Sequence, residues 1–149
     1  MLEKGRFYRN LGRLKLAGIE SEFRWFSEDF MLFLNYSLYE VLKSEDTRLA
    51  VGNRIKAIPR WMFKGGISFR LLPGLYISPQ VRVYGRTRWQ EGWLSPYAVW
   101  DCHLLYRYRN LWLSFKVENL FDKHFPRAGT TPPYPWPGRT LFFRLGVEF

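Results

Sequence analysis

Side chains of this chain alternate between apolar and polar in segments long enough to cross a membrane. From Leu141 to Phe149 the odd-numbered positions are Leu, Phe, Leu, Val and Phe, whereas the even-numbered ones are polar or glycine apart from Phe142. The same period of two recurs over 75–83 and 111–117. Because successive residues of a β-strand point to opposite faces, this period predicts strands rather than helices.

Seven such segments are expected. Each has about the 9–11 residues, or slightly more, that a tilted strand needs to cross a bilayer. An ordinary globular strand is shorter, at about 5–6 residues. The expected strands cover approximately residues 13–26, 30–40, 61–71, 75–87, 98–109, 111–121 and 140–149.

The connections between these segments alternate strictly between short and long. Short ones lie at 27–29, 72–74 and 109–110. Outer-membrane β-barrels have this layout, with short periplasmic turns and longer extracellular loops. We therefore predict an all-β, antiparallel transmembrane β-barrel segment in the Gram-negative outer membrane, with its C-terminus periplasmic. The long connections cover approximately 41–60, 88–97 and 122–139.

Charged side chains share one face of each predicted strand. An Arg or Lys at the bilayer midplane costs on the order of 2–4 kcal/mol on a lipid-facing surface, so these faces must line a water-filled or plugged lumen. Oppositely charged neighbours such as Glu20 and Arg24 could pair across that lumen, although the sequence leaves the pairs open. The expected lumen residues include Glu20, Glu22, Arg24, Lys64, Ser68, Arg70, Asp101, His103, Arg107 and Arg109.

Composition excludes several classes of protein. The formal net charge is +10, but the basic residues are spread through the strands and do not form one run, so we expect lumen and loop charges and no nucleic-acid partner. Cys102 is the only cysteine and should be a small apolar strand residue. No catalytic set, metal motif or cofactor motif is present, so neither an enzyme nor a cofactor protein is expected. Residues 1–30 contain no apolar signal-peptide core.

Two motifs near the end of the chain resemble those of TonB-dependent outer-membrane receptors. Residues 117–123 read VENLFDK, and residues 135–140 read PWPGRT, which is similar to the family's P-x-PGRT start of the last strand. Weaker similarities occur upstream in family order, at 10–12, 17–22 and 58–60, so that the resemblance covers nearly the whole chain. The motif residues are Asn119, Leu120, Phe121, Asp122, Pro137, Gly138 and Arg139.

This resemblance implies a barrel of about 22 strands with an amino-terminal plug, which imports ferric siderophores, haem or cobalamin with energy from the TonB complex. Seven strands alone would leave two open edges, which is untenable in lipid. We therefore expect residues 1–149 to be the C-terminal part of such a barrel, a fragment or truncated reading frame without the plug and the TonB box. The TonB complex would then be a partner only through the missing N-terminal part.

The resemblance also implies the other partners. They are outer-membrane lipid and lipopolysaccharide, the barrel-assembly machinery, and a siderophore-type ligand bound by the parent receptor. Leu145, Val147 and Phe149 resemble the signal that the assembly machinery reads. Arginine and aromatic residues of the loops and upper lumen could hold an anionic, catecholate-like complex, or could be ordinary loop residues. The ligand-binding candidates are Arg86, Arg88, Trp89, Trp93, His124 and Arg127.

Two other interpretations compete with the receptor fragment. A complete small outer-membrane barrel with a structural or binding role would need residues 1–9 as an eighth strand. A soluble basic β-protein that binds nucleic acid would need a second sheet to cover the apolar face that recurs on nearly every strand.

Overall fold

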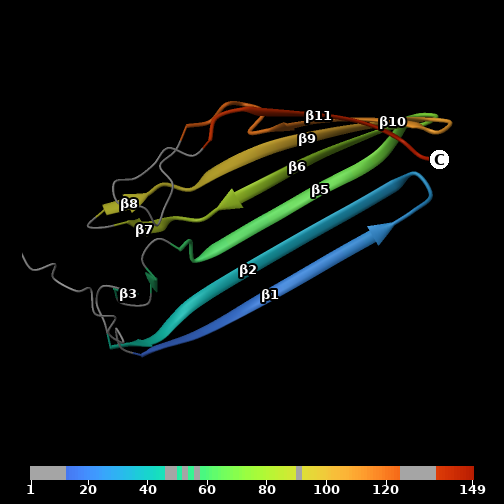
Figure 1. The fold of residues 1–149 in the computed structure, drawn as a ribbon. Helices are drawn as coiled ribbons and strands as arrows, with labels where there is room; N and C mark the ends of the chain where they lie inside the picture. The colour runs from blue at the N-terminus through green and yellow to red at the C-terminus, as the bar shows by residue number, and fades with distance from the viewer. Residues whose placement is uncertain (1–12, 46–49, 52–53, 56–57, 90–91, 125–136) are drawn as a thin grey trace, which may run out of the picture.

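A computed structural model describes residues 13–45, 50–51, 54–55, 58–89, 92–124 and 137–149. Every regular element in these ranges is a β-strand, and seven long strands form one sheet (Figure 1). The strands are β1 (Leu14–Phe26), β2 (Phe30–Ser44), β3 (Ala50–Val51), β4 (Arg54–Ile55), β5 (Trp61–Leu72), β6 (Leu75–Tyr84), β7 (Thr87–Trp89), β8 (Gly92–Leu94), β9 (Tyr97–Tyr108), β10 (Leu111–Glu118) and β11 (Thr140–Val147).

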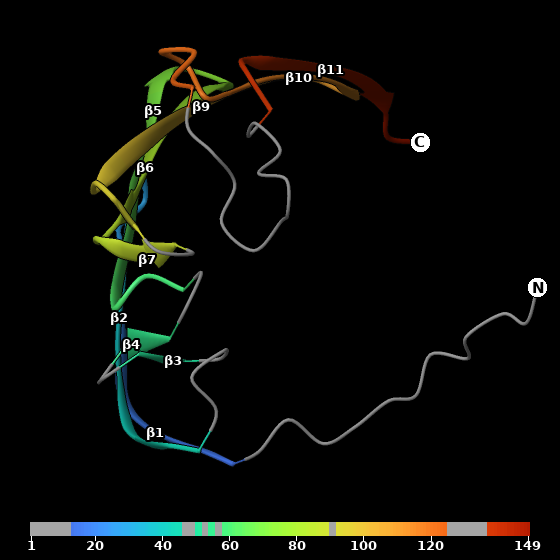
Figure 2. The same ribbon diagram turned by 90° about the vertical axis from the view of Figure 1, so that its left-hand side faces the viewer.

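The long strands pair antiparallel in the order β1-β2-β5-β6-β9-β10-β11, so each pairs with the next long strand along the chain. The prediction of a seven-stranded antiparallel segment is confirmed. The sheet follows an arc and does not close on itself, with β1 and β11 as its edges (Figure 2). The eighth strand that a small complete barrel would need falls on residues 1–9, which lie outside the described ranges.

Strand ends differ from the predicted ones where local geometry intervenes. β2 continues to Ser44, beyond the expected end at residue 40. β10 stops at Glu118 because Asn119 adopts a positive φ of 53°, which ends an extended strand. Two short hairpins, β3-β4 and β7-β8, lie within segments expected to be loops, and residues 87–89 belong to the second of them and not to β6.

Three short turns lie together at one end of the sheet, which we call the short-turn end; the opposite end is the long-loop end (Figure 1). Each turn accepts a backbone hydrogen bond from the strand beyond it. Arg70 N–H donates to Asp29 O at 2.9 Å, and Arg107 N–H donates to Gly74 O at 2.8 Å. Gly74 has a φ of 78° and lies against the Arg107 backbone, so a side chain there would be strained and would collide. These bonds extend the antiparallel pairing into the turns.

The two faces of the sheet differ in chemistry. Cross-strand partners on the concave face form a polar row through Glu22, Asn35, Lys64 and Arg82. The opposite face carries large apolar side chains, many more than half exposed; Val41 and Val99 are the buried hydrophobic residues of the described ranges. A sheet without a covered core is stable only where another apolar medium covers that face. Exposed examples are Ile19, Phe23, Trp25, Leu141, Phe143 and Leu145.

Pro79 lies within β6, which pairs with β5 on one side and β9 on the other. The β5–β6 ladder pairs Gly66 with Gln80 and Phe69 with Ile77, but it has no pair between these two positions. Proline lacks the N–H that such a pair uses, which explains the gap. On the concave face the Ser78 hydroxyl donates to the Ser68 hydroxyl at 2.8 Å, which joins the two strands at the same level.

Replacing Pro79 by valine is expected to restore the missing ladder bond. We expect the free energy of unfolding to rise by about 1 kcal/mol, the usual net contribution of one hydrogen bond. Urea unfolding of the folded protein in detergent measures this change. Pro96→Val, in the exposed connection before β9, should give no gain. An equal gain in both variants would contradict the role assigned to the ladder gap.

Candidate functional site

The β7–β8 hairpin at the long-loop end brings together three of the candidate residues. Arg86 and Arg88 place their guanidinium carbons 4.6 Å and 5.3 Å from the ring centroid of Trp93. Arg88 and Trp93 are cross-strand partners, which keeps them on one face of the hairpin. Two cations on one indole ring form a surface suited to an anionic, partly aromatic ligand.

The base of this hairpin is firmly attached to the sheet. Gly85 N–H donates to Trp61 O at 2.9 Å, and the buried Thr87 hydroxyl donates to Gly85 O at 3.1 Å. The Nε of Arg88 is buried without a hydrogen-bond partner. Arg60 and Arg82 also bury an unpartnered Nε, so this feature alone does not mark a ligand site.

The remaining candidates are not brought to this cluster. His124 is exposed and follows the end of β10, on a different segment from the β7–β8 hairpin. Trp89 pairs through its backbone with Gly92, but its side chain lies outside the described part. Arg127 also lies outside the described residues.

The first motif forms a closed turn at the end of β10. Asn119 is only 2% exposed. Its side-chain amide donates to Lys123 O at 3.1 Å and to Pro137 O at 3.4 Å, and its side-chain oxygen accepts from Lys123 N–H at 2.8 Å. Asparagine tolerates the left-handed backbone that this position adopts. Asn119 therefore closes the turn and holds it against the segment that leads into β11.

The second motif is held by Asp122, which also has a positive φ, of 50°. Its carboxylate accepts the backbone N–H of Arg139 at 2.8 Å, directly before β11. A side chain added at Gly138 would lie 2.8 Å from the same carboxylate oxygen, so glycine leaves the space that this contact needs. The two motifs thus act together to set the start of β11.

A buried ion pair connects this turn to the rest of the sheet. Asp101 is 8% exposed, and its carboxylate lies 2.9 Å from an Arg82 guanidinium nitrogen. The same carboxylate accepts the backbone N–H of Asn119 at 2.9 Å. Strands β6, β9 and β10 are therefore linked through one carboxylate. The sequence placed Asp101 on the lumen face, but it did not indicate either partner.

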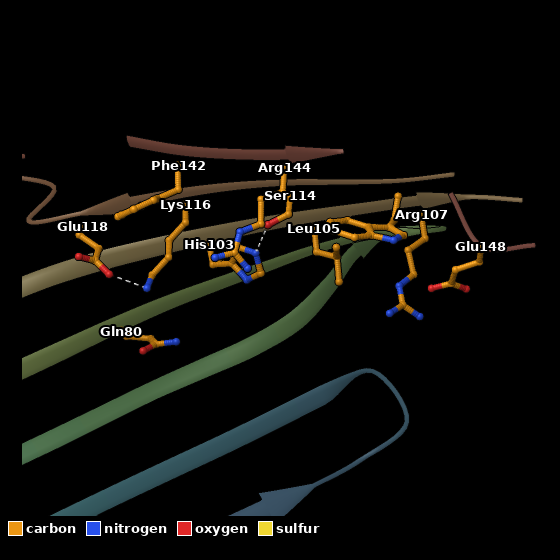
Figure 3. A pocket seen from close by; sticks show the side chains of 11 residues that line it. Gln80, His103, Leu105, Arg107, Ser114, Lys116, Glu118, Phe142, Arg144 and Glu148 are labelled. Atoms are coloured by element: carbon orange, nitrogen blue, oxygen red, sulfur yellow. Dashed lines mark hydrogen bonds and ion pairs between the residues drawn. The ribbon is translucent and has the colours of Figure 1, made fainter. Parts of the chain in front are cut away.

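A concave pocket of about 730 Å³ lies on the polar face over β9, β10 and β11 (Figure 3). His103 Nε2 is 2.7 Å from the Ser114 hydroxyl, and Lys116 forms an ion pair with Glu118 at 2.6 Å. Arg107 and Arg144 also point into the pocket (Figure 3). This polar wall agrees with the expected lumen face. The other lining residues are Gln80, Leu105, Trp112, Phe142 and Glu148.

The structure decides one pairing that the sequence left open and corrects one residue of the expected lumen face. Arg24 forms its ion pair with Glu22 at 2.5 Å, whereas Glu20 accepts a hydrogen bond from Tyr39 on the next strand. Arg109 is a turn residue with a φ of 50°, and its guanidinium lies 5.4 Å from the ring centroid of Tyr108. Alternation contains neither feature: the contact of Tyr39 with Glu20 depends on strand register, and the position of Arg109 depends on the tight turn.

Neither a metal site nor a membrane-spanning helix is found in the described residues. No three His, Cys, Asp or Glu side chains gather there in a way that could hold a metal ion. No helix in this part of the chain is long and apolar enough to cross a membrane. Cys102 is a free, partly buried residue of β9.

Comparison with protein families gives a match over most of the chain. The family described as TonB dependent receptor-like, beta-barrel, matches residues 3–120. The chain belongs to the TonB-dependent receptor family. Membership places the sheet in a β-barrel of the Gram-negative outer membrane, and its exposed apolar face is the one that such a barrel turns to lipid. Comparison with curated proteins gives no match.

Solved structures of TonB-dependent receptors share the fold. The ferric yersiniabactin uptake receptor FyuA from Yersinia pestis matches with a TM-score of 0.77 and 22% identity, over 94% of this chain and 24% of that chain. The siderophore receptor PiuA from Acinetobacter baumannii gives 0.74 and 17%, over 93% and 22%. The ferric enterobactin receptor PfeA from Pseudomonas aeruginosa, a mutant in complex with enterobactin, gives 0.69 and 23%, over 94% and 23%. This chain therefore spans about a quarter of their length.

Within the TonB-dependent receptor fold, the residues of the expected assembly signal lie on edge strand β11 and just beyond it. Leu145 and Val147 are 65% and 50% exposed on the apolar face, and Phe149 follows the end of the strand. An exposed edge with an apolar outer face suits recognition by another strand. Their role as an assembly signal stays a prediction.

Proposed function

We propose that residues 1–149 form the C-terminal part of the barrel of an outer-membrane receptor that imports a scarce ligand with energy from the TonB complex. A ferric siderophore is the favoured ligand, with haem and cobalamin as the other members of the class. The observation that carries this proposal is the open seven-stranded sheet with one exposed apolar face and one charged concave face. In this proposal the plug and the TonB-binding segment belong to other parts of the receptor.

The arrangement of turns supports an orientation. Short turns gather at one end of the sheet, and the two additional hairpins extend from the other (Figure 1). In outer-membrane barrels the short turns are periplasmic. The C-terminus, at the short-turn end, is then periplasmic, and the β7–β8 hairpin faces the outside of the cell.

The hairpin cluster supports an anionic ligand. The guanidinium groups of Arg86 and Arg88 flank Trp93, which is 40% exposed and therefore accessible. A ferric catecholate complex combines negative charge with flat rings, which matches both properties of the cluster. Catalysis is not part of this proposal.

Uptake of iron tests the proposed function. Cells that depend on the full receptor carrying these strands should accumulate radioactive iron from ferric enterobactin, and dissipation of the inner-membrane proton gradient should abolish accumulation while binding persists. If cells without the receptor bound and accumulated as much iron as cells with it, the proposed transport of catecholates would be contradicted. The same assay with haem and cobalamin separates the other ligand classes.

The double variant Arg86→Gln/Arg88→Gln should weaken binding of ferric enterobactin at least tenfold. A hydrogen bond to a charged group contributes about 1.5–3 kcal/mol, and about 1.4 kcal/mol corresponds to a factor of ten. The matched control is Arg24→Gln/Arg70→Gln, which removes the same charge from arginines already paired with Glu22 and Asp29. Equal losses in both variants would show a general charge effect and would remove the hairpin from the ligand site.

A further inference from the structure

The apolar face of the sheet has a hollow at Gly65. Four consecutive strands align Leu34, Gly65, Val81 and Trp100 as successive cross-strand partners. Side chains of one face stand side by side along such a row. Glycine is the only member of this row without a side chain; the Phe63 ring and a Leu34 methyl lean over its buried position, and a groove lies beside them.

The hollow is an apolar groove of about 280 Å³. Besides the row itself, its lining includes Phe63 and Ile67 of β5 and Pro79 of β6. A Cβ added at Gly65 would lie 2.9 Å from the Phe63 ring and 3.1 Å from a Leu34 methyl, so the walls lean over the glycine. The Trp100 side chain, 43% exposed, bounds the groove on the β9 side.

The groove is continuous with the exposed apolar face, which is the face that a barrel of this family turns to lipid. The groove walls consist mainly of aliphatic and aromatic carbon atoms. A bound water needs two to four polar partners, so this groove suits an apolar occupant and not water. Within a bilayer, the hydrophobic effect does not favour one apolar contact over another, but close van der Waals packing does. A flexible methylene chain can follow a groove one side chain deep, and a rigid helix or strand cannot.

We propose that this groove is a binding site for one acyl chain of an outer-membrane lipid, held longer than the lipid around the rest of the barrel. The inference rests on the proposed membrane location of the sheet and adds a specific lipid site to it. The chain is seated between Phe63 and Trp100, with Gly65 and Pro79 forming the floor.

Photo-crosslinking in vesicles tests this site. The full-length protein that carries these strands is inserted into phosphatidylethanolamine–phosphatidylglycerol vesicles containing a trace of phosphatidylglycerol with a diazirine in its acyl chain. After illumination, mass spectrometry of peptides locates the adducts. We expect adducts per exposed apolar residue to be about fivefold more frequent at the groove than elsewhere on the apolar face.

Val81→Phe fills the groove and should lower this enrichment to the level of the surrounding face. Val83→Phe is the matched control, because it makes the same change on the same strand and face but does not line the groove. Evenly distributed adducts in the unchanged protein, or an unchanged enrichment in Val81→Phe, would overturn the site.

Heat-modifiable migration of each variant reports insertion separately. A protein that inserts and imports iron but shows no enrichment refutes the acyl-chain site alone. A protein that does not insert refutes the membrane location, and with it both this site and the proposed function.

Discussion

Replacing Asn119 by alanine is expected to lower the free energy of unfolding by about 3 kcal/mol, since buried groups left unpaired cost about 1–3 kcal/mol each. The substitution removes the side-chain hydrogen bonds to Lys123 N–H and O, at 2.8 Å and 3.1 Å, from a residue that is 2% exposed. It also places alanine at a φ of 53°, a left-handed backbone that glycine, asparagine and aspartate tolerate better than alanine does. Urea unfolding in detergent measures the loss.

Two further variants separate the possible causes. Asn110→Ala, at an exposed position in the turn between β9 and β10, should change the free energy of unfolding by less than about 0.5 kcal/mol. Asn119→Asp keeps the oxygen that accepts from Lys123 and the tolerance for the left-handed backbone, but loses the amide donor. Its loss should be intermediate. Similar small losses at 119 and 110 would show that the turn does not depend on the motif asparagine.

Replacing Asp101 by alanine should cost about 3 kcal/mol, the lower end of the range for breaking a buried ion pair by removing one partner. The carboxylate is 8% exposed and holds both Arg82, at 2.9 Å, and the N–H of Asn119, at 2.9 Å. Its removal leaves a mostly buried guanidinium and a buried N–H without acceptors. The free energy of unfolding, measured with urea, and the amount of protein in the outer membrane should both fall.

The control for this variant is Asp29→Ala. Asp29 also pairs with an arginine, Arg70, at 2.8 Å, but both side chains are about half exposed. Exposed pairs contribute about 0–1 kcal/mol, so the loss should be small. The double variant Arg82→Met/Asp101→Leu should recover part of the stability, because apolar replacement of a whole buried pair is often neutral. Equal losses for Asp29→Ala and Asp101→Ala would contradict the role assigned to burial.

The Asp101 carboxylate accepts the backbone N–H of Asn119, and the Asn119 side chain closes the same turn, so their effects should not add. The double variant Asp101→Ala/Asn119→Ala is expected to lose less than the sum of the single variants, as residues of one network usually do. The same contacts give the VENLFDK and PGRT motifs a structural role. Within the described residues they act through turn closure and strand placement, and the contacts of Asn119, Asp122 and Gly138 show no need for a ligand.

The sequence by itself determined the two chemically different faces of the long strands. Alternation predicted seven strands, the charged concave face and the exposed apolar face, because a strand must turn successive side chains to opposite sides. Lys64, Ser68 and Asp101 lie on the expected face for this reason. The alternation of short and long connections likewise predicted the meander order that the sheet adopts.

Only the tertiary structure decided which side chains meet. A strand can slip by two residues without moving any side chain to the other face, so alternation leaves the register open. Register decides that Arg82 pairs with Asp101, nineteen residues away, and that Tyr39 reaches Glu20 on the neighbouring strand. It also aligns Gly65 with Leu34 and Val81 to form the groove. The face of a side chain follows from the geometry of a single strand, whereas its cross-strand neighbour depends on the hydrogen-bonded alignment of two strands.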